Sequence, residues 1–268
     1  MPITLDARRS FVRQATCLSL WLARRLAASG KQFRHTLTTC TNLYRFTLLW
    51  DGQHHPADPP PGWRDPQWED LLDKLDAIDA AFPPGDAPPE MEAQSLELLW
   101  PSMEPRLERD VAAWPVPADK PFGFFNYRPD DDGWTHGKIT LHLNNPFAPA
   151  SPFDDLRQRA RELNMLLHHG RQQRPDLHTV SLSSWLAGFG PLQSLFPQEF
   201  AQSASPPWAL AYHLGWWGQF IDRAGGFHER NGLHLRTTGQ FRYPCITCAC
   251  PIDAALAHLR QRFGIETE

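Results

Sequence analysis

The stretch "NNPFAPASPFDDLRQRARELNMLLHHG", residues 144–170, predicts a helix with signals at both of its ends. Ser151 is suited to cap the first turn, and Pro152 suits the first helical position because an N–H group there would have no partner. Apolar side chains recur at spacings of three and four residues and form one stripe for a core to bury: Leu156, Ala160, Leu163 and Leu167. We expect Gly170 to end this helix.

Short apolar runs on either side of the helix predict β-strands. The segments "FGFFNY", residues 122–127, and "GKITLHL", residues 137–143, enclose a polar stretch that contains Asp-Gly, a pattern typical of a β-hairpin. Beyond the helix, "HTVSLSSWL", residues 178–186, alternates as strands do, and "PWALAYHLGW", residues 207–216, carries a bulky side chain at every second position. We therefore expect strands at all four places.

The C-terminal part continues this pattern. The stretch "FRYPCITCAC", residues 241–250, is expected to form the last strand, and Asp253 and Gly264 to cap and to end a last helix. The order of elements after residue 115 is that of an α+β fold, in which helices pack on a mixed β-sheet. We expect this domain to span residues 116–268.

Residues 1–115 predict a helical region, either a separate domain or a cover on the sheet. The apolar stripe of the first helix consists of Phe11, Ala15, Leu18, Leu22 and Leu26. The pair Arg8 and Arg9 in front of it also resembles a twin-arginine export signal, although the apolar run behind it is short. Further helices are expected over residues 33–47, 66–82 and 90–113, with a long proline-rich loop before Pro66 and Asp65 as the cap of the second helix.

Charge and composition narrow the classes of partner. The chain of 268 residues has a formal net charge of −4, which offers no electrostatic footprint for a nucleic-acid backbone. No apolar run approaches the ~20 residues that a membrane span needs, so we expect no membrane partner. Five cysteines without regular spacing favour reduced thiols and a cytoplasmic location. Nothing in the sequence indicates an oligomeric state.

Three cysteines lie close together in the expected last strand: Cys245, Cys248 and Cys250. Thiols at this spacing can bind zinc or copper(I), with a histidine elsewhere in the chain as the fourth ligand. The leading interpretation is a buried strand, because a free cysteine behaves as a small apolar residue. A redox pair is the weakest alternative, since no thioredoxin-like arrangement accompanies the cysteines.

The ends of the expected strands offer another kind of site. His142 lies on the second hairpin strand, and Asn144 and Asn145 stand between that strand and a helix start, where free N–H groups favour an anion. Ser184 and Trp185 end the next strand. The structural alternative is that the asparagines close the strand, that the hydroxyl group makes turn hydrogen bonds, and that His142 is an ordinary sheet residue.

Aromatic groups gather at the end of the strand expected over residues 207–216. Tyr212, Trp216 and Trp217 surround His213 and could line a flat ligand pocket. Alternatively, these rings plug the space between the sheet and the helical region. If they line a pocket, His142 or Tyr212 is the candidate acid or base, because such groups near a strand end can exchange a proton with an amine.

With these elements in place, residues 137–197 resemble the C-terminal part of the GNAT-like acyltransferase family. The resemblance rests on Leu141-His142 in a strand before a helix, and on Ser184-Trp185-Leu186 at a strand end after it. It implies a GNAT-like fold and the use of acyl-CoA, with the cofactor's pyrophosphate held by backbone N–H groups after the central strand. In this chain the corresponding loop has no glycine and several prolines, which lack that donor.

Two hypotheses of function follow. In the first, the protein binds a small-molecule ligand in a cleft formed by His142, Ser184 and Trp216, with acyl transfer as its chemistry. In the second, it is a non-catalytic interaction or metal-handling protein whose cysteine cluster binds zinc or copper(I).

Overall fold

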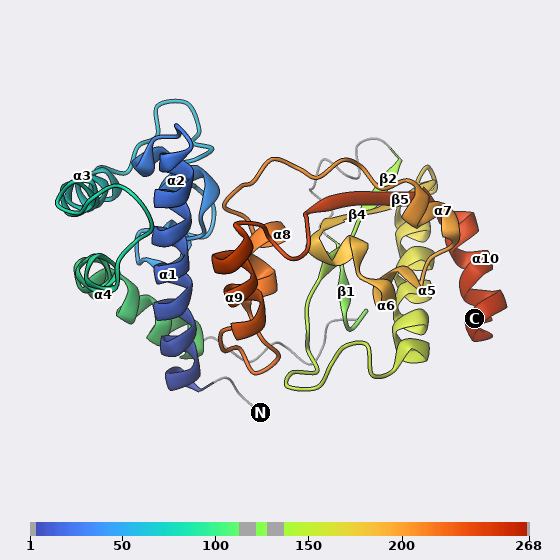
Figure 1. Ribbon diagram of the computed structural model, residues 1–268. Coiled ribbons are helices and arrows are strands. Elements are labelled where there is room, and N and C mark those ends of the chain that lie inside the picture. Colours follow the sequence, from blue (N-terminus) through green and yellow to red (C-terminus); the bar gives the residue numbers. More distant parts are fainter. Residues whose placement is uncertain (1–3, 113–121, 128–136, 267–268) are drawn as a thin grey trace. The chain divides into compact units, whose positions relative to one another are not determined.

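The structure is a computed structural model, and it describes residues 4–112, 122–127 and 137–266 (Figure 1). The chain forms two units that alternate along the sequence. The first, called the helical unit below, comprises Met1–Pro115 and Leu210–Arg242. The second, called the α+β unit, comprises Val116–Ala209 and Tyr243–Glu268. The chain passes from the first unit to the second after Pro115, and Leu210–Arg242 belongs to the helical unit and not to the unit that precedes it in sequence.

The helical unit is built from two stretches of chain. Its N-terminal elements are α1 (Leu5–Ala28), α2 (Phe33–Cys40), the 3-10 helix η1 (Tyr44–Phe46), α3 (Pro66–Ala80) and α4 (Pro89–Ala112). Its second stretch adds α8 (Leu214–Trp217), η4 (Gly218–Phe220) and α9 (Glu229–Thr238). Helix α1 packs against α2, α4 and α9, so the first helix of the sequence is central to this unit.

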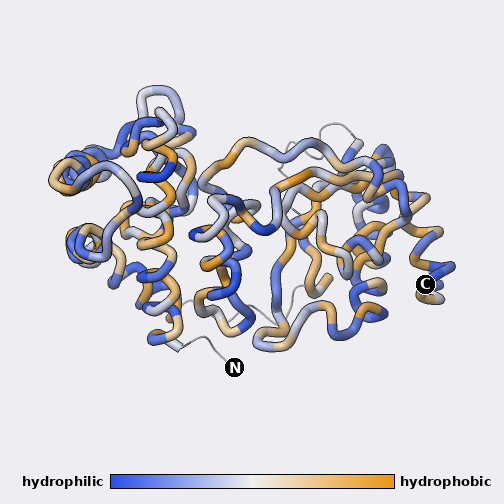
Figure 2. The backbone as a smooth tube through the Cα atoms, in the orientation of Figure 1, coloured by the Kyte–Doolittle hydropathy of each residue, from blue (hydrophilic) through white to orange (hydrophobic). Residues whose placement is uncertain are grey.

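The expected stripe of α1 faces the core of the helical unit. Phe11, Ala15, Leu18 and Leu22 are buried, and the Thr4 hydroxyl group accepts a hydrogen bond from the Ala7 N–H to cap the first turn. Figure 2 shows both apolar and polar residues along this helix, as one buried face requires. The expected start of α3 is also confirmed, since the Asp65 carboxylate accepts hydrogen bonds from two N–H groups of its first turn.

Several expectations for this unit were wrong in detail. The helix expected over residues 33–47 stops at Cys40, because the Thr41 hydroxyl group donates to the Leu37 carbonyl while the Thr41 backbone is extended. The strand expected over residues 207–216 does not form. Residues 204–211 have no regular secondary structure, and α8 begins at Leu214. Helix α9 was not expected, because its sequence carries no continuous apolar stripe.

The α+β unit contains short strands and packed helices. Its strands are β1 (Phe125–Asn126), β2 (Lys138–Thr140), β3 (His142–Leu143), β4 (Thr179–Ser184) and β5 (Ile246–Pro251). Its helices are α5 (Leu156–Gln173), η3 (Trp185–Gly188), α6 (Gly190–Gln193), α7 (Gln198–Gln202) and α10 (Ile252–Phe263). The mixed α+β fold class is therefore confirmed.

The strands form two sheets. Strand β4 lies in the centre of a three-stranded sheet, parallel to β2 and antiparallel to β5. Strands β1 and β3 form a separate antiparallel pair, with Asn126 opposite His142. The expected hairpin is thus present only between β1 and β3, since the segment of residues 137–143 divides between the two sheets. The turn expected between its arms lies outside the described residues.

Helix α5 differs from its expected bounds at both ends. It begins at Leu156, because the Asp155 carboxylate accepts the hydrogen bond from the Gln158 N–H and Asp155 is the cap. Ser151 instead accepts a hydrogen bond in the turn before the helix. Gly170 does not end α5 but lies inside it, since the helix continues to Gln173. A Cβ atom at Gly170 would overlap the side chain of Ile139, which explains the glycine.

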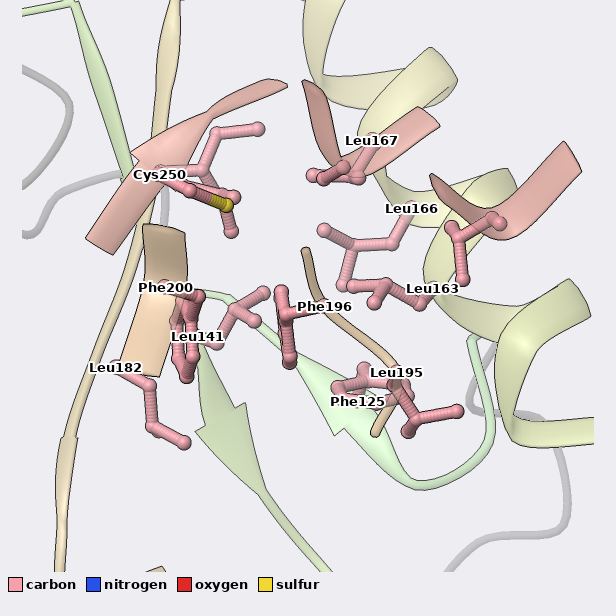
Figure 3. Packing of buried hydrophobic residues seen from close by; sticks show 14 of the residues in the cluster. Phe125, Leu141, Leu163, Leu166, Leu167, Leu182, Leu195, Phe196, Phe200 and Cys250 are labelled. Carbon is pink, nitrogen blue, oxygen red and sulfur yellow. The ribbon is translucent and has the colours of Figure 1, made fainter. Parts of the chain in front are cut away.

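The core of the α+β unit fills the space between its sheet and its helices. Figure 3 shows Leu163, Leu166 and Leu167 of α5 turned toward a cluster that includes Phe196 and Phe200. The last helix begins at Ile252, with Pro251 rather than Asp253 at its cap, and Gly264 ends it in the left-handed conformation. No helix within the described ranges has both the length and the apolar character that crossing a bilayer requires.

Candidate functional site

The predicted site residues are divided between the two units. His142, Asn144, Asn145, Ser184 and Trp185 belong to the α+β unit. Tyr212, Trp216 and Trp217 belong to the helical unit. The two groups are therefore described separately.

In the α+β unit, the segment of residues 138–143 changes its partner at Leu141. Up to Thr140 it pairs with β4, and the Leu141 N–H still donates to the Ser181 carbonyl over 2.8 Å. The next residue, His142, pairs with β1 instead. The segment that contains β2 and strand β4 therefore diverge after Leu141. His142 then lies beside β1, and the last residues of β4 continue without β2 beside them.

This parting leaves the backbone edge at the end of β4 without a described strand beside it. Because N–H and C=O groups alternate in direction along a strand, Ser183 presents both groups to the same side as Ser181, toward β2. Leu182 and Ser184 face β5 and lie opposite Cys248 and Ile246 in that ladder. Within residues 4–112, 122–127 and 137–266, no strand pairs with the Ser183 edge.

The far edge of the same sheet is covered. Ser203 and Ser205 accept hydrogen bonds through their hydroxyl groups from the Ala249 and Thr247 N–H groups of β5. The Trp208 N–H adds a bond of 2.9 Å to the Cys245 carbonyl. The segment of residues 203–208 thus satisfies the outer edge of the sheet, and the edge at Ser183 differs from it in having no such cover among the described residues.

The hydroxyl side chains beside this edge are ordered by one another. The Trp208 indole N–H donates to the Thr247 hydroxyl group over 3.0 Å, and that oxygen lies 2.8 Å from the Ser183 hydroxyl oxygen. A third pair is formed by Thr140 of β2 and Ser181 of β4, two residues before Ser183, and its hydroxyl oxygens lie 3.5 Å apart. These contacts fix the Ser183 side chain and give the site a polar wall.

The asparagines after β3 shape the loop that leads to α5. Asn145 accepts a hydrogen bond from the Phe147 N–H and donates to the Ala150 carbonyl, while the Asn144 N–H donates to the Phe124 carbonyl. Asp154 and Asp155 then place two carboxylates at the start of the helix. Asp155 accepts the Gln158 N–H of the first turn, Asp154 accepts the Ser151 N–H before the helix, and both negative charges repel an anion, so this helix start is a poor phosphate site.

Ser184 and Trp185 complete the end of β4. The Ser184 hydroxyl group accepts a hydrogen bond of 3.2 Å from the Leu186 N–H and so caps η3. The half-buried Trp185 ring lies 5.6 Å from the Tyr243 ring. Trp185 thus provides an aromatic surface next to the open edge, and Ser184 holds the turn that follows it.

The aromatic residues in the helical unit belong to its packing. Trp216 and Trp217 are buried, and both rings contact Phe241. Tyr212 is half-buried and stacks on His55, with ring centroids 3.6 Å apart and planes 7° apart. Burial raises the pKa of Tyr212, and nearby Asp58 adds to that shift.

The three clustered cysteines are buried, Cys248 and Cys250 within β5 and Cys245 just before it. Cys245, Cys248 and Cys250 are free and buried, and the Cys248 thiol contacts the Ala187 carbonyl. Burial raises the pKa of Cys245 to about 11 and, together with nearby Glu199, that of Cys250 to about 12. In the part of the chain that the structure describes, no three His, Cys, Asp or Glu side chains converge as a metal ion would need.

Sequence reasoning missed His55, which is 2% exposed. Its Nδ1 atom accepts a hydrogen bond from the Ala57 N–H, so the neutral ring carries its proton on Nε2. That Nε2 atom has no hydrogen-bond partner among the described residues. Burial, helped by Arg45, lowers the pKa of His55 to about 3. The only signal in the sequence was its place in the proline-rich loop, which is weak.

A buried ion pair on α5 was also missed. Arg159 and Glu162 face each other inside the α+β unit, and Arg159 lies 3.9 Å from the centre of the Phe147 ring. Glu162 also accepts a hydrogen bond of 3.0 Å from the Phe124 N–H. The pair therefore ties α5 to the turn before β1 and to the loop after β3.

Comparison of the chain with protein-family models, with curated proteins and with solved structures found no match.

Proposed function

We propose that the α+β unit binds a small molecule at the open backbone edge of β4, between Ser183 and His142. The observation that carries this proposal is the change of partner at Leu141, which leaves the Ser183 N–H and C=O without a strand among the described residues. An extended ligand with amide groups would satisfy both, as peptides do when they add to a sheet edge. Trp185 supplies an apolar surface beside it.

An acyl thioester is the ligand class that we propose for this edge. The resemblance to GNAT-like acyltransferases motivates the acyl group, and the amides of a pantetheine arm match the donor and acceptor of Ser183. The carboxylates of Asp154 and Asp155 at the start of α5 argue against a pyrophosphate there. We therefore expect the pantetheine arm, rather than the nucleotide, to supply the binding free energy.

Acyl transfer to an amine is the reaction that this arrangement could serve. His142 would accept the proton of the amine as its nitrogen attacks the thioester carbonyl, and the thiolate that leaves would take up a proton. We assign this role to His142 rather than Tyr212, because Tyr212 belongs to the helical unit and stacks on His55.

For the location of the protein we propose the cytoplasm, because its five cysteines are free thiols, as is usual in a reducing compartment.

Thermal denaturation with acetyl-pantetheine and with acetyl-CoA tests the proposal. A ligand at ten times its dissociation constant stabilises by about 1.4 kcal/mol, which raises the melting temperature of a domain of this size by a few degrees, roughly 2–5 °C. We expect both compounds to give this shift at millimolar concentration. His142→Ala should reduce the shift, whereas His178→Ala, at the opposite end of β4, should not. No shift with either compound would refute the proposal.

A further inference from the structure

The helical unit carries a cationic hollow on the outer face of α9. Its volume is about 460 Å³, within the range of small-ligand sites. Six side chains line it: Arg230, Leu233, His234, Thr237, Thr238 and Arg242. None of them is a carboxylate, although the chain as a whole has a net charge of −4.

Helical spacing explains why these groups meet. Arg230, His234 and Thr237 recur at intervals of four and three residues, so they share one face of α9. The opposite face is buried through Asn231 and Leu235. The cationic face therefore points away from the core of the helical unit.

Arg242 follows α9 in sequence but is directed back to the first turn of the helix. Its guanidinium contacts the Asn231 side-chain oxygen at 3.5 Å, and Asn231 is itself held by a bond of 2.7 Å to the Gln219 carbonyl. Asn231 is only 3% exposed, so the anchor is part of the packed structure. Arg242 thus reaches back toward the N-terminal half of α9, where Arg230 lies.

The arginines of α9 differ in how their charge is balanced. Arg236 pairs with Glu92 over 2.9 Å and is directed toward α4. Arg230 makes no ion pair with any residue that the structure describes. A helix that neutralises one arginine internally and directs another into a hollow has a positive charge available for a ligand.

We infer that this hollow binds the phosphate group of a small phosphorylated molecule. Arginine side chains donate paired hydrogen bonds to phosphate oxygens, and the His234 imidazole and the Thr237 hydroxyl group supply further donors. A phosphate has more acceptor oxygens than a carboxylate and so uses more of these groups. The exposed Leu233 side chain at the rim offers an apolar contact to the rest of the ligand. This inference does not depend on the site proposed at β4.

Titration of the whole protein with pyrophosphate, followed by calorimetry at low salt, tests the inference. We expect saturable binding that Arg230→Gln and Arg242→Gln each weaken by about fivefold to tenfold, as expected for loss of one exposed charge-assisted hydrogen bond. Arg236→Gln is the matched control, because it removes the same charge from the same helix, and it should change the affinity less than about twofold.

Two results would overturn the inference. One is the absence of saturable pyrophosphate binding up to about ten millimolar, which is beyond the range of a specific site. The other is equal weakening by Arg236→Gln, which would mean that pyrophosphate responds to overall charge and not to the hollow. Because Arg230 is exposed, its variant is expected to fold, which circular dichroism checks.

Discussion

The indole N–H of Trp217 donates a hydrogen bond to the backbone carbonyl of Cys40 over 2.9 Å. Both groups are buried, and the bond joins the end of α2 to the segment that returns to the helical unit late in the sequence. This contact explains why the ring is a tryptophan and not another aromatic residue. It satisfies a carbonyl that the end of α2 leaves without an intrahelical partner.

Trp217→Phe should therefore destabilise the helical unit by more than the loss of ring size alone. We expect the free energy of unfolding to fall by about 2–4 kcal/mol, since a buried carbonyl loses its donor and a cavity forms. Trp208→Phe is the control, because its indole bond to Thr247 is exposed, and it should cost less than about 1 kcal/mol. Denaturant unfolding measures both, and equal losses would contradict the role assigned to Trp217.

Gly123→Ala should destabilise the α+β unit at the turn before β1. Gly123 has a φ of +57°, and an added Cβ atom would overlap the carboxylate of Glu162, which Arg159 and the Phe124 N–H hold in place. Gly264→Ala is the matched control, because Gly264 has a φ of +62° with open space around it.

Gly264→Ala should cost about 1 kcal/mol through backbone strain alone, and Gly123→Ala at least about 1 kcal/mol more. Equilibrium unfolding in urea compares the two variants. If both lose the same amount, the Glu162 carboxylate moves aside without cost and does not anchor the turn.

Because of His55, the free energy of unfolding should decrease as the pH falls. Its pKa is lowered to about 3 in the folded state, below the ordinary value, so the unfolded chain binds the proton more readily. Stability due to the neutral ring is complete above the ordinary pKa of about 6.5 and is lost as the pH falls toward 3.

Replacement of His55 by Gln removes the contribution of this proton to the pH dependence of the free energy of unfolding. We expect the wild-type protein to lose stability between about pH 6.5 and 4 more steeply than His55→Gln, by up to about 1.4 kcal/mol per pH unit. Urea unfolding across this range measures the difference between the slopes, in which the other titrating groups cancel. Parallel slopes would mean that His55 is protonated in the folded protein.

The clustered cysteines should be inert in the native protein. Because burial raises the pKa of Cys245 and Cys250 to about 11 and about 12, almost no thiolate is present near neutral pH. Iodoacetamide at pH 8 should leave Cys245, Cys248 and Cys250 unmodified until the protein is unfolded, as mass spectrometry of the peptides will show. Rapid alkylation of the native protein would contradict this prediction, and stoichiometric zinc or copper in the purified protein would favour the metal-handling hypothesis.

Local sequence patterns predicted the elements in which apolar residues recur at the regular spacing of a helix or of a strand and are buried on one face. The stripe of α1 at Phe11 and Leu18 is buried as expected, and the alternation around Val180 forms β4. Caps were less predictable. Ser151 and Asp155 can both cap a helix, and the preference for Asp155 depends on how the preceding loop folds against Arg159.

Tertiary contacts decided the rest. The alternation from Trp208 to Trp216 is that of a strand, but of its five bulky groups only Trp216 is buried, and Leu214 is 48% exposed. For the site, the sequence indicated His142 and Ser184 as residues near strand ends. It named Ser183 only for its hydroxyl group and did not indicate its backbone, because a strand edge without a partner arises from the pairing of strands far apart in sequence and leaves no side-chain pattern.

Amide hydrogen exchange at Ser183, measured by NMR with and without acetyl-pantetheine, tests the central claim most directly. In the free protein, the Ser183 amide should exchange faster than the Leu182 amide, which faces β5. Saturation with acetyl-pantetheine should slow the exchange of Ser183 and leave that of Leu182 nearly unchanged. A Ser183 amide that is already as protected as that of Leu182, or one whose exchange the ligand does not alter, would contradict the account.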